Sequence, residues 1–399
     1  MNKSIALLIF MWSCTFNACE IFARDADSLF TFNEKRNWQL SLTSHFGKIV
    51  KNYGNMPDRT ASFIHEFHFG IVTNGSKQWH HLYNFPEVGA SFLYSDFGND
   101  NVLGQNFAII PNITFSPSSY KPFNVKVTLG MGLAYFTRPF DEETNTENRL
   151  VGSAVANMSM ASFYIHRYLN KHFDMLMGLT AFHCSNGHYK VPNYGLNFPA
   201  VHLGIKYRPN GDYKIAERNN IYERRGPLKF NFRVGMGVHE FAGTNGPVGT
   251  SKWGIYTSSL YVSKRFGPVS NIHCGFAVKY YNDFYNKIIK DSIYTENQHL
   301  KSGVLTFLLA HELMINKVGF LVQGGLDLYN PFYNKWHELT DSEKTIFTFL
   351  ESITSTRIGF QYYFFDPKMN SAKNIFIGAY VKANFGKADY VGMNIGFVL

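Results

Sequence analysis

Apolar residues alternate with small or charged residues along most of the chain, and this period of two constrains the fold more than any other feature. In residues 228–239 one set comprises Leu228, Phe230, Phe232, Val234, Met236 and Val238. The intervening set comprises Lys229, Asn231, Arg233, Gly235, Gly237 and His239. Because successive side chains of a strand point to opposite faces, the segment predicts a strand with one apolar face. Residues 123–135 show the same pattern.

The composition favours a membrane barrel over a soluble sheet protein. The chain is 45% hydrophobic and 17% aromatic, but its mean hydropathy is −0.17. No apolar run reaches the roughly 18 residues that a membrane-spanning helix needs. A soluble sandwich also alternates, but its outer faces are rarely so small and glycine-rich. A β-barrel needs only alternate residues to face lipid, so the predicted class is an all-β, transmembrane antiparallel barrel of the outer-membrane type.

The number of strand-length segments leaves two arrangements open. Roughly 16 segments can be counted. Even strand numbers of 12, 14 or 16 are realistic for bacterial barrels, and we predict one barrel of about 14 strands. The alternative is two eight-stranded barrels in tandem, joined by the charged segment 209–226. We find no internal repeat, which favours the single barrel. The last residues, "ADYVGMNIGFVL", resemble the terminal strand of outer-membrane barrels.

The N-terminus predicts export. Lys3 is followed by the apolar run 5–12 and then by small and polar residues up to Ala23. This order is typical of a secretory signal peptide, so we assign residues 1–23 to the signal and residues 24–399 to the barrel. Lipidation at Cys19 is a weaker alternative. The predicted location is the outer membrane of a Gram-negative bacterium.

The net charge of +9 predicts affinity for an anionic surface. The phosphate-rich lipopolysaccharide leaflet and nucleic acid are both anionic, and a scattered solubilising excess of lysine is a third reading. With a barrel as the predicted fold, we expect lipopolysaccharide and outer-membrane lipids as partners and no nucleic acid. Only Cys184 and Cys274 remain after signal removal, so a disulfide framework is not expected.

One short stretch combines chemistry with geometry. Residues 182–197 read "FHCSNGHYKVPNYGLN". Parity along the strand 171–185 places His183 and Ser185 on the same face as the apolar residues Met177 and Leu179. On the next strand Asn197 shares the face of Val201 and Leu203. Counting turns back from a periplasmic C-terminus makes the loop 185–194 extracellular. Three polar residues are thus predicted on the lipid-facing surface near the outer rim, where polar groups require a reason.

This stretch resembles the active-site segment of the PagL-type lipid A 3-O-deacylases. The family pattern is His-x-Ser-Asn, then Pro-Asn-x-Gly, then an acidic residue two positions later. It matches without gaps at His183, Ser185, Asn186, Pro192, Asn193 and Gly195. Residues 150–208 carry the close similarity. The resemblance implies an esterase that removes the 3-O-linked acyl chain of lipid A without a cofactor, with Ser185 as nucleophile and His183 as general base. It also implies that Asn186 and Gly187 contribute to the oxyanion hole.

The chain departs from the family at the acidic position, which is Asn197. An asparagine can accept the ring N–H and orient the base, as in Cys-His-Asn proteases, but it supplies no negative charge. Three functions therefore compete. They are a lipid A esterase, a channel or structural barrel that retains the hairpin as scaffold, and a phospholipase-like esterase that uses the same residues.

Phosphate-loop, Gly-x-Ser-x-Gly and helical zinc motifs are absent from the sequence.

Overall fold

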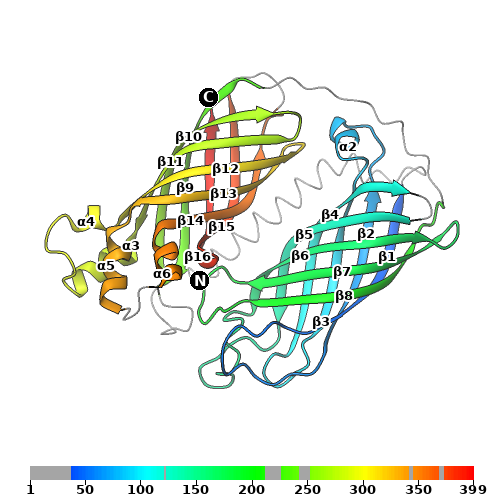
Figure 1. The fold of residues 1–399 in the computed structure, drawn as a ribbon, viewed down its shortest axis with the longest axis horizontal. Helices are drawn as coiled ribbons and strands as arrows, with labels where there is room; N and C mark the ends of the chain where they lie inside the picture. The colour runs from blue at the N-terminus through cyan, green and yellow to red at the C-terminus, as the bar shows by residue number, and fades with distance from the viewer. Residues whose placement is uncertain (1–36, 121–122, 212–225, 242–251, 341–344, 368–372) are drawn as a thin grey trace, which may run out of the picture. The chain divides into compact units, whose positions relative to one another are not determined.

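The computed structural model describes residues 37–120, 123–211, 226–241, 252–340, 345–367 and 373–399. The predicted signal peptide and most of the predicted linker 209–226 lie outside these ranges. Sixteen antiparallel strands close into two barrels of eight strands, which Figure 1 labels in chain order. No described helix is long and apolar enough to cross a membrane.

The first barrel contains β1 to β8 in chain order. Its strands are β1 Trp38–Gly47, β2 Ser62–Val72, β3 Glu87–Asp96, β4 Gln105–Tyr120, β5 Phe123–Phe136, β6 Val155–Tyr168, β7 Phe173–Ser185 and β8 Leu196–Tyr207. The barrel closes because β8 returns to pair with β1, from Leu40↔Tyr207 to Gly47↔Ala200. The prediction of an antiparallel β-barrel is therefore confirmed.

The second barrel contains β9 to β16. Its strands are β9 Leu228–Glu240, β10 Lys252–Phe266, β11 Ser270–Tyr281, β12 Gly303–Ile315, β13 Val318–Tyr329, β14 Thr354–Tyr363, β15 Asn374–Asn384 and β16 Lys387–Val398. Here β16 pairs with β9, from Val391↔Val238 to Val398↔Asn231. The expected single barrel of about 14 strands is thus wrong, and the tandem alternative holds. The alternation of apolar and polar residues is the same for one large barrel and for two small ones. The pairing of β8 with β1 and of β16 with β9 decides between them.

Side-chain burial follows the predicted parity. On β7, Leu179 is 60% exposed and its neighbour Thr180 is 3% exposed. On β8, Val201 is exposed and His202 is buried. The apolar face points outward and the polar face inward, which is the reverse of a soluble domain and the arrangement of a barrel that lipid surrounds.

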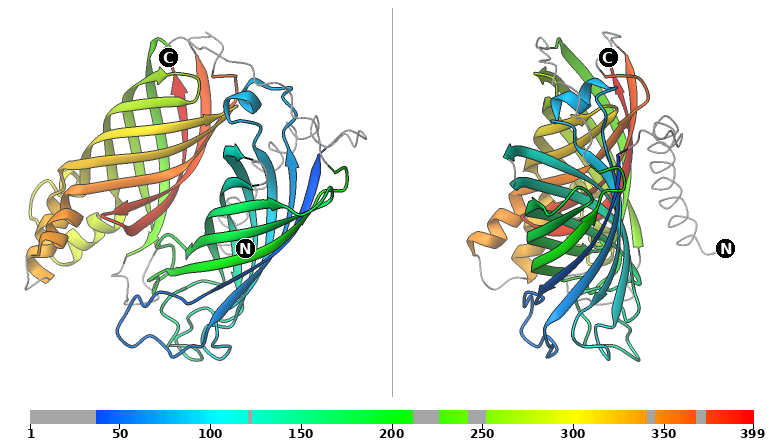
Figure 2. Two further views of the ribbon diagram at one scale, coloured as in Figure 1. Left: turned by 45° about the vertical axis from the view of Figure 1, so that its right-hand side comes forward. Right: turned by 90° about the vertical axis from the view of Figure 1, so that its right-hand side faces the viewer.

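Two layers fill the first barrel. At the end that carries the 186–195 loop, loop and strand side chains form an apolar core that includes Ile49, Phe97, Leu150, Phe182 and Phe198. Deeper in the lumen the side chains are polar and paired, for example His68 with Glu87 at 3.0 Å and Lys206 with Glu87 at 2.7 Å. Buried charges are tolerated when they are paired in this way. The views in Figure 2 show several long loops at one end of this barrel and the connection that carries α2 at the other.

Helical connections occupy one end of the second barrel (Figure 1). They are α3 Asn282–Lys290, α4 Gln298–Lys301, α5 Pro331–Thr340 and α6 Ile346–Ile353. Phe284 and Ile288 of α3 pack with Tyr281 and Phe332 in a buried aromatic cluster. Because Asn282 begins α3 directly after Tyr281, the last residue of β11, the helix continues the strand, and its buried residues include Phe284 and Ile288.

The connection between β2 and β3 carries the short helix α2, Gln78–Leu82, and a buried histidine. The backbone N–H of Gly75 donates to Nδ1 of His80 at 3.1 Å, so this nitrogen must be unprotonated. Nε2 of His80 is buried without a hydrogen-bond partner among the described residues. Burial, followed by the charges of Lys77 and His81, lowers the pKa of His80 to about 4.

We predict that this connection loosens at acidic pH. The pKa of His80 lies below its unfolded value near 6.5, so its contribution to stability is complete above about pH 6.5 and is lost as the pH falls toward 4. Between pH 7 and pH 5 the loss is up to about 2 kcal/mol, or roughly tenfold or more in local opening. Hydrogen exchange of the α2 amides, corrected for intrinsic rates, measures this opening. His80→Gln should remove the pH dependence, and an equal dependence in both proteins would contradict the prediction.

Candidate active site

The predicted site residues meet where β7 and β8 pair. His183 stands directly opposite Asn197 in the register of the two strands. Nδ1 of His183 lies 2.8 Å from Oδ1 of Asn197. Because a carboxamide oxygen only accepts, Nδ1 carries the proton and Nε2 has a free lone pair. Asn197 therefore fixes the imidazole in the tautomer that a general base requires.

The site opens toward the outer surface of the barrel. The side chain of His183 is exposed, and Ser185 and Asn197 are half-buried. Leu179, Val201 and Leu203 continue the same face down the two strands and are all more than half exposed. The two strands therefore place the polar site residues directly above an apolar surface, as parity predicted.

Two N–H groups converge on the serine. The backbone N–H of Gly187 lies 3.1 Å from Oγ of Ser185, and Nδ2 of Asn193 lies 2.9 Å from it. The other end of the Asn193 amide is held in place, since its Oδ1 accepts from the backbone N–H of Asn186 at 3.2 Å. These two donors lie beside the atom that would attack, where they could turn to a carbonyl oxygen bound next to Ser185 Oγ.

Sequence reasoning did not assign Asn193 to this position. The available signal was its place in the Pro-Asn pair of the motif, eight residues after the serine. That spacing gives no direction for the amide, because the return of the loop toward Ser185 depends on its tertiary contacts. Only the folded loop shows that the amide of Asn193 points at the hydroxyl.

Asn186 serves the loop rather than the serine. Its Nδ2 donates to the carbonyl of Lys190 at 2.7 Å and to Oγ of Ser153 at 3.2 Å. Its Oδ1 accepts from the backbone N–H of His188 at 3.0 Å. Of the two residues predicted for the oxyanion hole, Gly187 directs a donor at Ser185, whereas Asn186 organises the turn that presents it.

Two neighbouring loops hold the hairpin. The backbone N–H of Val50 donates to the carbonyl of Asn197 at 2.9 Å, and Nδ2 of Asn52 donates to the carbonyl of Gly195 at 2.5 Å. From the other side, the N–H of Gly195 donates to the carbonyl of Leu150 at 3.0 Å. These main-chain contacts fix the strand that carries Asn197 and the turn that precedes it.

Gly195 lies directly beneath the imidazole. Its φ of +73° is a conformation that favours glycine. A Cβ at this position would lie 3.2 Å from Cε1 of His183 and 3.3 Å from the carbonyl oxygen of Cys184. The absence of a side chain therefore lets the histidine ring lie close over the backbone.

The side chains of Ser185 and His183, the predicted nucleophile and base, do not contact each other. Within the part of the chain that the structure describes, no hydrogen bond joins the His183 ring to the Ser185 hydroxyl. The residues lie two apart on one strand face, so their Cα atoms are about 6.7 Å apart. Rotation of the serine hydroxyl from Asn193 toward Nε2 of His183 would bring the two side chains into contact, and such contacts often tighten only when substrate binds.

No group of His, Cys, Asp and Glu side chains among the described residues is arranged for a metal ion.

Comparison with known proteins finds similarity in the first barrel. Residues 65–206, from β2 to β8, match the model of a family described as "Lipid A 3-O-deacylase (PagL)". Among solved structures, the outer membrane enzyme PagL is 14% identical, with 42% of this chain and 97% of that chain covered and a TM-score of 0.29. Neisserial surface protein A is 10% identical, with 43% and 96% covered and a TM-score of 0.30. No curated protein matches the sequence.

We predict that Gly195→Ala slows the reaction of Ser185 without unfolding the barrel. An alanine at positive φ costs about 1–2 kcal/mol and pushes the His183 ring away, so labelling of Ser185 by a fluorophosphonate should slow about tenfold. Gly54→Ala in the neighbouring loop is the matched control, because a Cβ there meets nothing within 4 Å. Equal labelling rates for the two variants would show that the ring does not depend on Gly195.

Proposed function

Because residues 65–206 match the lipid A 3-O-deacylase (PagL) family, we propose that the first barrel is an outer-membrane serine esterase that hydrolyses the 3-O-linked acyl chain of lipid A. The observation that carries the proposal is the hydrogen bond between His183 and Asn197 beside a serine that faces two N–H donors. A neutral imidazole with a free Nε2 is the form that can accept the proton of a serine hydroxyl.

The reaction follows from these positions. Nε2 of His183 takes the proton of Ser185 as Oγ attacks the ester carbonyl. The carbonyl oxygen becomes an oxyanion, which the N–H groups of Gly187 and Asn193 stabilise. The sugar hydroxyl leaves with the proton from His183, and an acyl group remains on the serine. Water, activated by the same histidine, then releases the fatty acid and restores Ser185.

The surroundings of the site suit a lipid of the outer leaflet. The exposed apolar side chains of Leu179, Val201 and Leu203 would lie along the acyl chain while the ester reaches Ser185 at the rim. Lys48 and Lys51 are exposed on the segment that runs beside Asn197. An ammonium group at this depth suits a phosphorylated headgroup. These features support an anionic lipid substrate over a soluble ester.

Loss of either Ser185 or His183 should abolish deacylation. With the protein expressed in a bacterium of defined lipid A, the mass of lipid A should fall by one hydroxyacyl chain, and Ser185→Ala or His183→Ala should prevent the change. Ser44→Ala is the matched control. Like Ser185 it lies near a histidine on the outer side of the barrel, since its hydroxyl bonds His65 at 3.0 Å, but it is outside the β7–β8 hairpin.

The same samples distinguish the competing functions. A change in phospholipids with unchanged lipid A would identify a phospholipase-like enzyme. If a correctly inserted wild-type protein changes neither lipid class, the proposal of an esterase is wrong and the barrel is non-catalytic.

Restoring the acidic residue should accelerate the reaction. Asn197→Glu places a carboxylate opposite Nδ1 of His183, where its charge stabilises the imidazolium that forms in the transition state. We expect kcat to rise at least about tenfold if the missing charge limits acylation. Asn197→Gln lengthens the side chain by the same amount without adding charge, so it separates the effect of charge from that of length. An equal or lower rate for Asn197→Glu would mean that orientation alone is sufficient in this chain.

A further inference from the structure

The second barrel contains two buried arginines that no carboxylate neutralises. Arg233 on β9 is 2% exposed and Arg357 on β14 is 6% exposed. Among the described residues neither forms an ion pair, and the Nε of each is buried without a hydrogen-bond acceptor. A buried charge without a partner is costly, so such a pair calls for a counter-charge.

The two guanidinium groups belong to one cluster. Nη2 of Arg233 donates to Oε1 of Gln323 at 3.1 Å and to Oγ of Ser259 at 3.3 Å. Gln323 stands directly opposite Arg357 in the register of β13 and β14. Because Arg233 bonds Gln323, and Gln323 stands opposite Arg357, the two guanidinium groups lie at the same level of the lumen.

Tyrosine hydroxyls add further donors. Cζ of Arg357 lies 3.4 Å from the ring centroid of Tyr380, and Cζ of Arg233 lies 5.2 Å from that of Tyr261. Both hydroxyls are buried without a hydrogen-bond partner within the described ranges. The Nε group of each arginine and the two tyrosine hydroxyls are therefore donors without an acceptor among the described residues.

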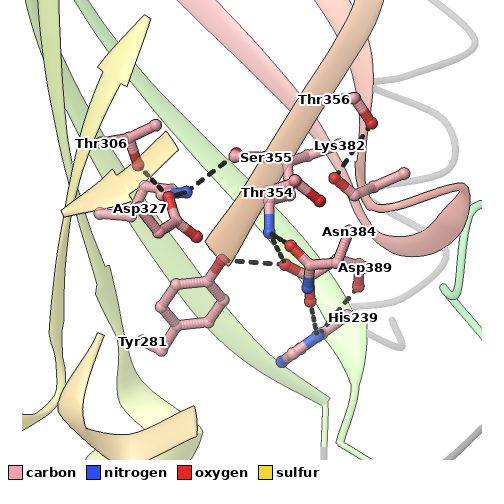
Figure 3. A network of polar contacts seen from close by, with 12 residues as sticks. His239, Tyr281, Thr306, Asp327, Thr354, Ser355, Thr356, Lys382, Asn384 and Asp389 are labelled. Atoms are coloured by element: carbon pink, nitrogen blue, oxygen red, sulfur yellow. Dashed lines mark hydrogen bonds and ion pairs between the residues drawn. The ribbon is translucent and has the colours of Figure 1, made fainter. Parts of the chain in front are cut away.

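The carboxylates of the same lumen are already engaged. Asp327 accepts from Lys279 at 3.1 Å, and Asp389 accepts from Lys382 at 2.7 Å and from Tyr281 at 2.9 Å. Figure 3 shows Asp327 and Asp389 within this network.

Two further acidic residues are paired with histidines. Asp283 accepts from His239 at 2.7 Å, and Glu312 accepts from His273 at 3.1 Å. Glu312 also accepts from the Tyr363 hydroxyl and from the amide of Gln361. Each of these four carboxylates thus already has a cationic or histidine partner, and none of them pairs with Arg233 or Arg357.

We infer that Arg233 and Arg357, with the hydroxyls of Tyr261 and Tyr380, form a binding site for a small inorganic anion in the lumen of the second barrel. The chemistry fits because guanidinium and hydroxyl groups donate and do not accept when they bind chloride or phosphate. An eight-stranded barrel has an interior that side chains nearly fill, so the ligand is a small ion rather than an organic anion. The site is independent of the esterase proposed for the first barrel.

Anion-dependent stability tests the site on the purified full chain in detergent. Chloride is raised from about 1 mM to about 300 mM with gluconate keeping the ionic strength constant, and a parallel series uses inorganic phosphate. We expect the Tm of the wild-type protein to rise by about 5 °C in at least one series. Arg233→Met and Arg357→Met should lose this dependence, even if removal of a buried charge raises their Tm overall.

The control is Arg167→Met, an exposed arginine of the first barrel that lies over the Phe123 ring; it should retain the dependence. Crystals grown in bromide give a second readout, an anomalous peak between Arg233 and Arg357. A wild-type Tm that does not respond to either anion overturns the inference. The same anion response in both arginine variants overturns it as well.

Discussion

The main-chain pairing of β8 with β1 is the constraint on which the first barrel and its site depend. This ladder runs from Leu40↔Tyr207 to Gly47↔Ala200 and closes the sheet on itself. Beyond its end, Val50 still donates to the carbonyl of Asn197, so the closure extends to the first residues of β8. With β8 fixed, its pairing with β7 sets Asn197 opposite His183. A slip of one residue would turn the side chain of Asn197 into the lumen.

The hairpin also shows how a histidine, a serine and an asparagine can be brought together on the outside of a sheet. A strand face supplies the histidine and the serine two residues apart, and the returning loop supplies the amide of Asn193. The neighbouring loops hold this loop through backbone hydrogen bonds, so its position does not depend on the lipid-facing side chains. The polar network of the lumen lies on the other side of the same strands. Each face can therefore carry a different chemistry.

The two barrels resolve the problem of buried charge differently. In the first lumen Glu87 is shared by His68 and Lys206, and Asp174 bonds both His166 and Arg208. In the second lumen lysines and histidines take the carboxylates, and Arg233 and Arg357 contact neutral groups and aromatic rings. This difference follows from the sequence of the second barrel, which places its two buried arginines beside neutral side chains.

The sequence by itself determined the strands and their faces. Alternation placed apolar residues outward and predicted that His183, Ser185 and Asn197 share the outer surface, because side-chain direction in a strand depends only on parity. It did not determine which strands close the sheet, since one barrel or two satisfy the same alternation. Tertiary structure decided this through the pairing of β8 with β1 and of β16 with β9. It also decided that the amide of Asn193, rather than that of Asn186, faces Ser185, because a loop has no parity and its side-chain directions follow from its contacts.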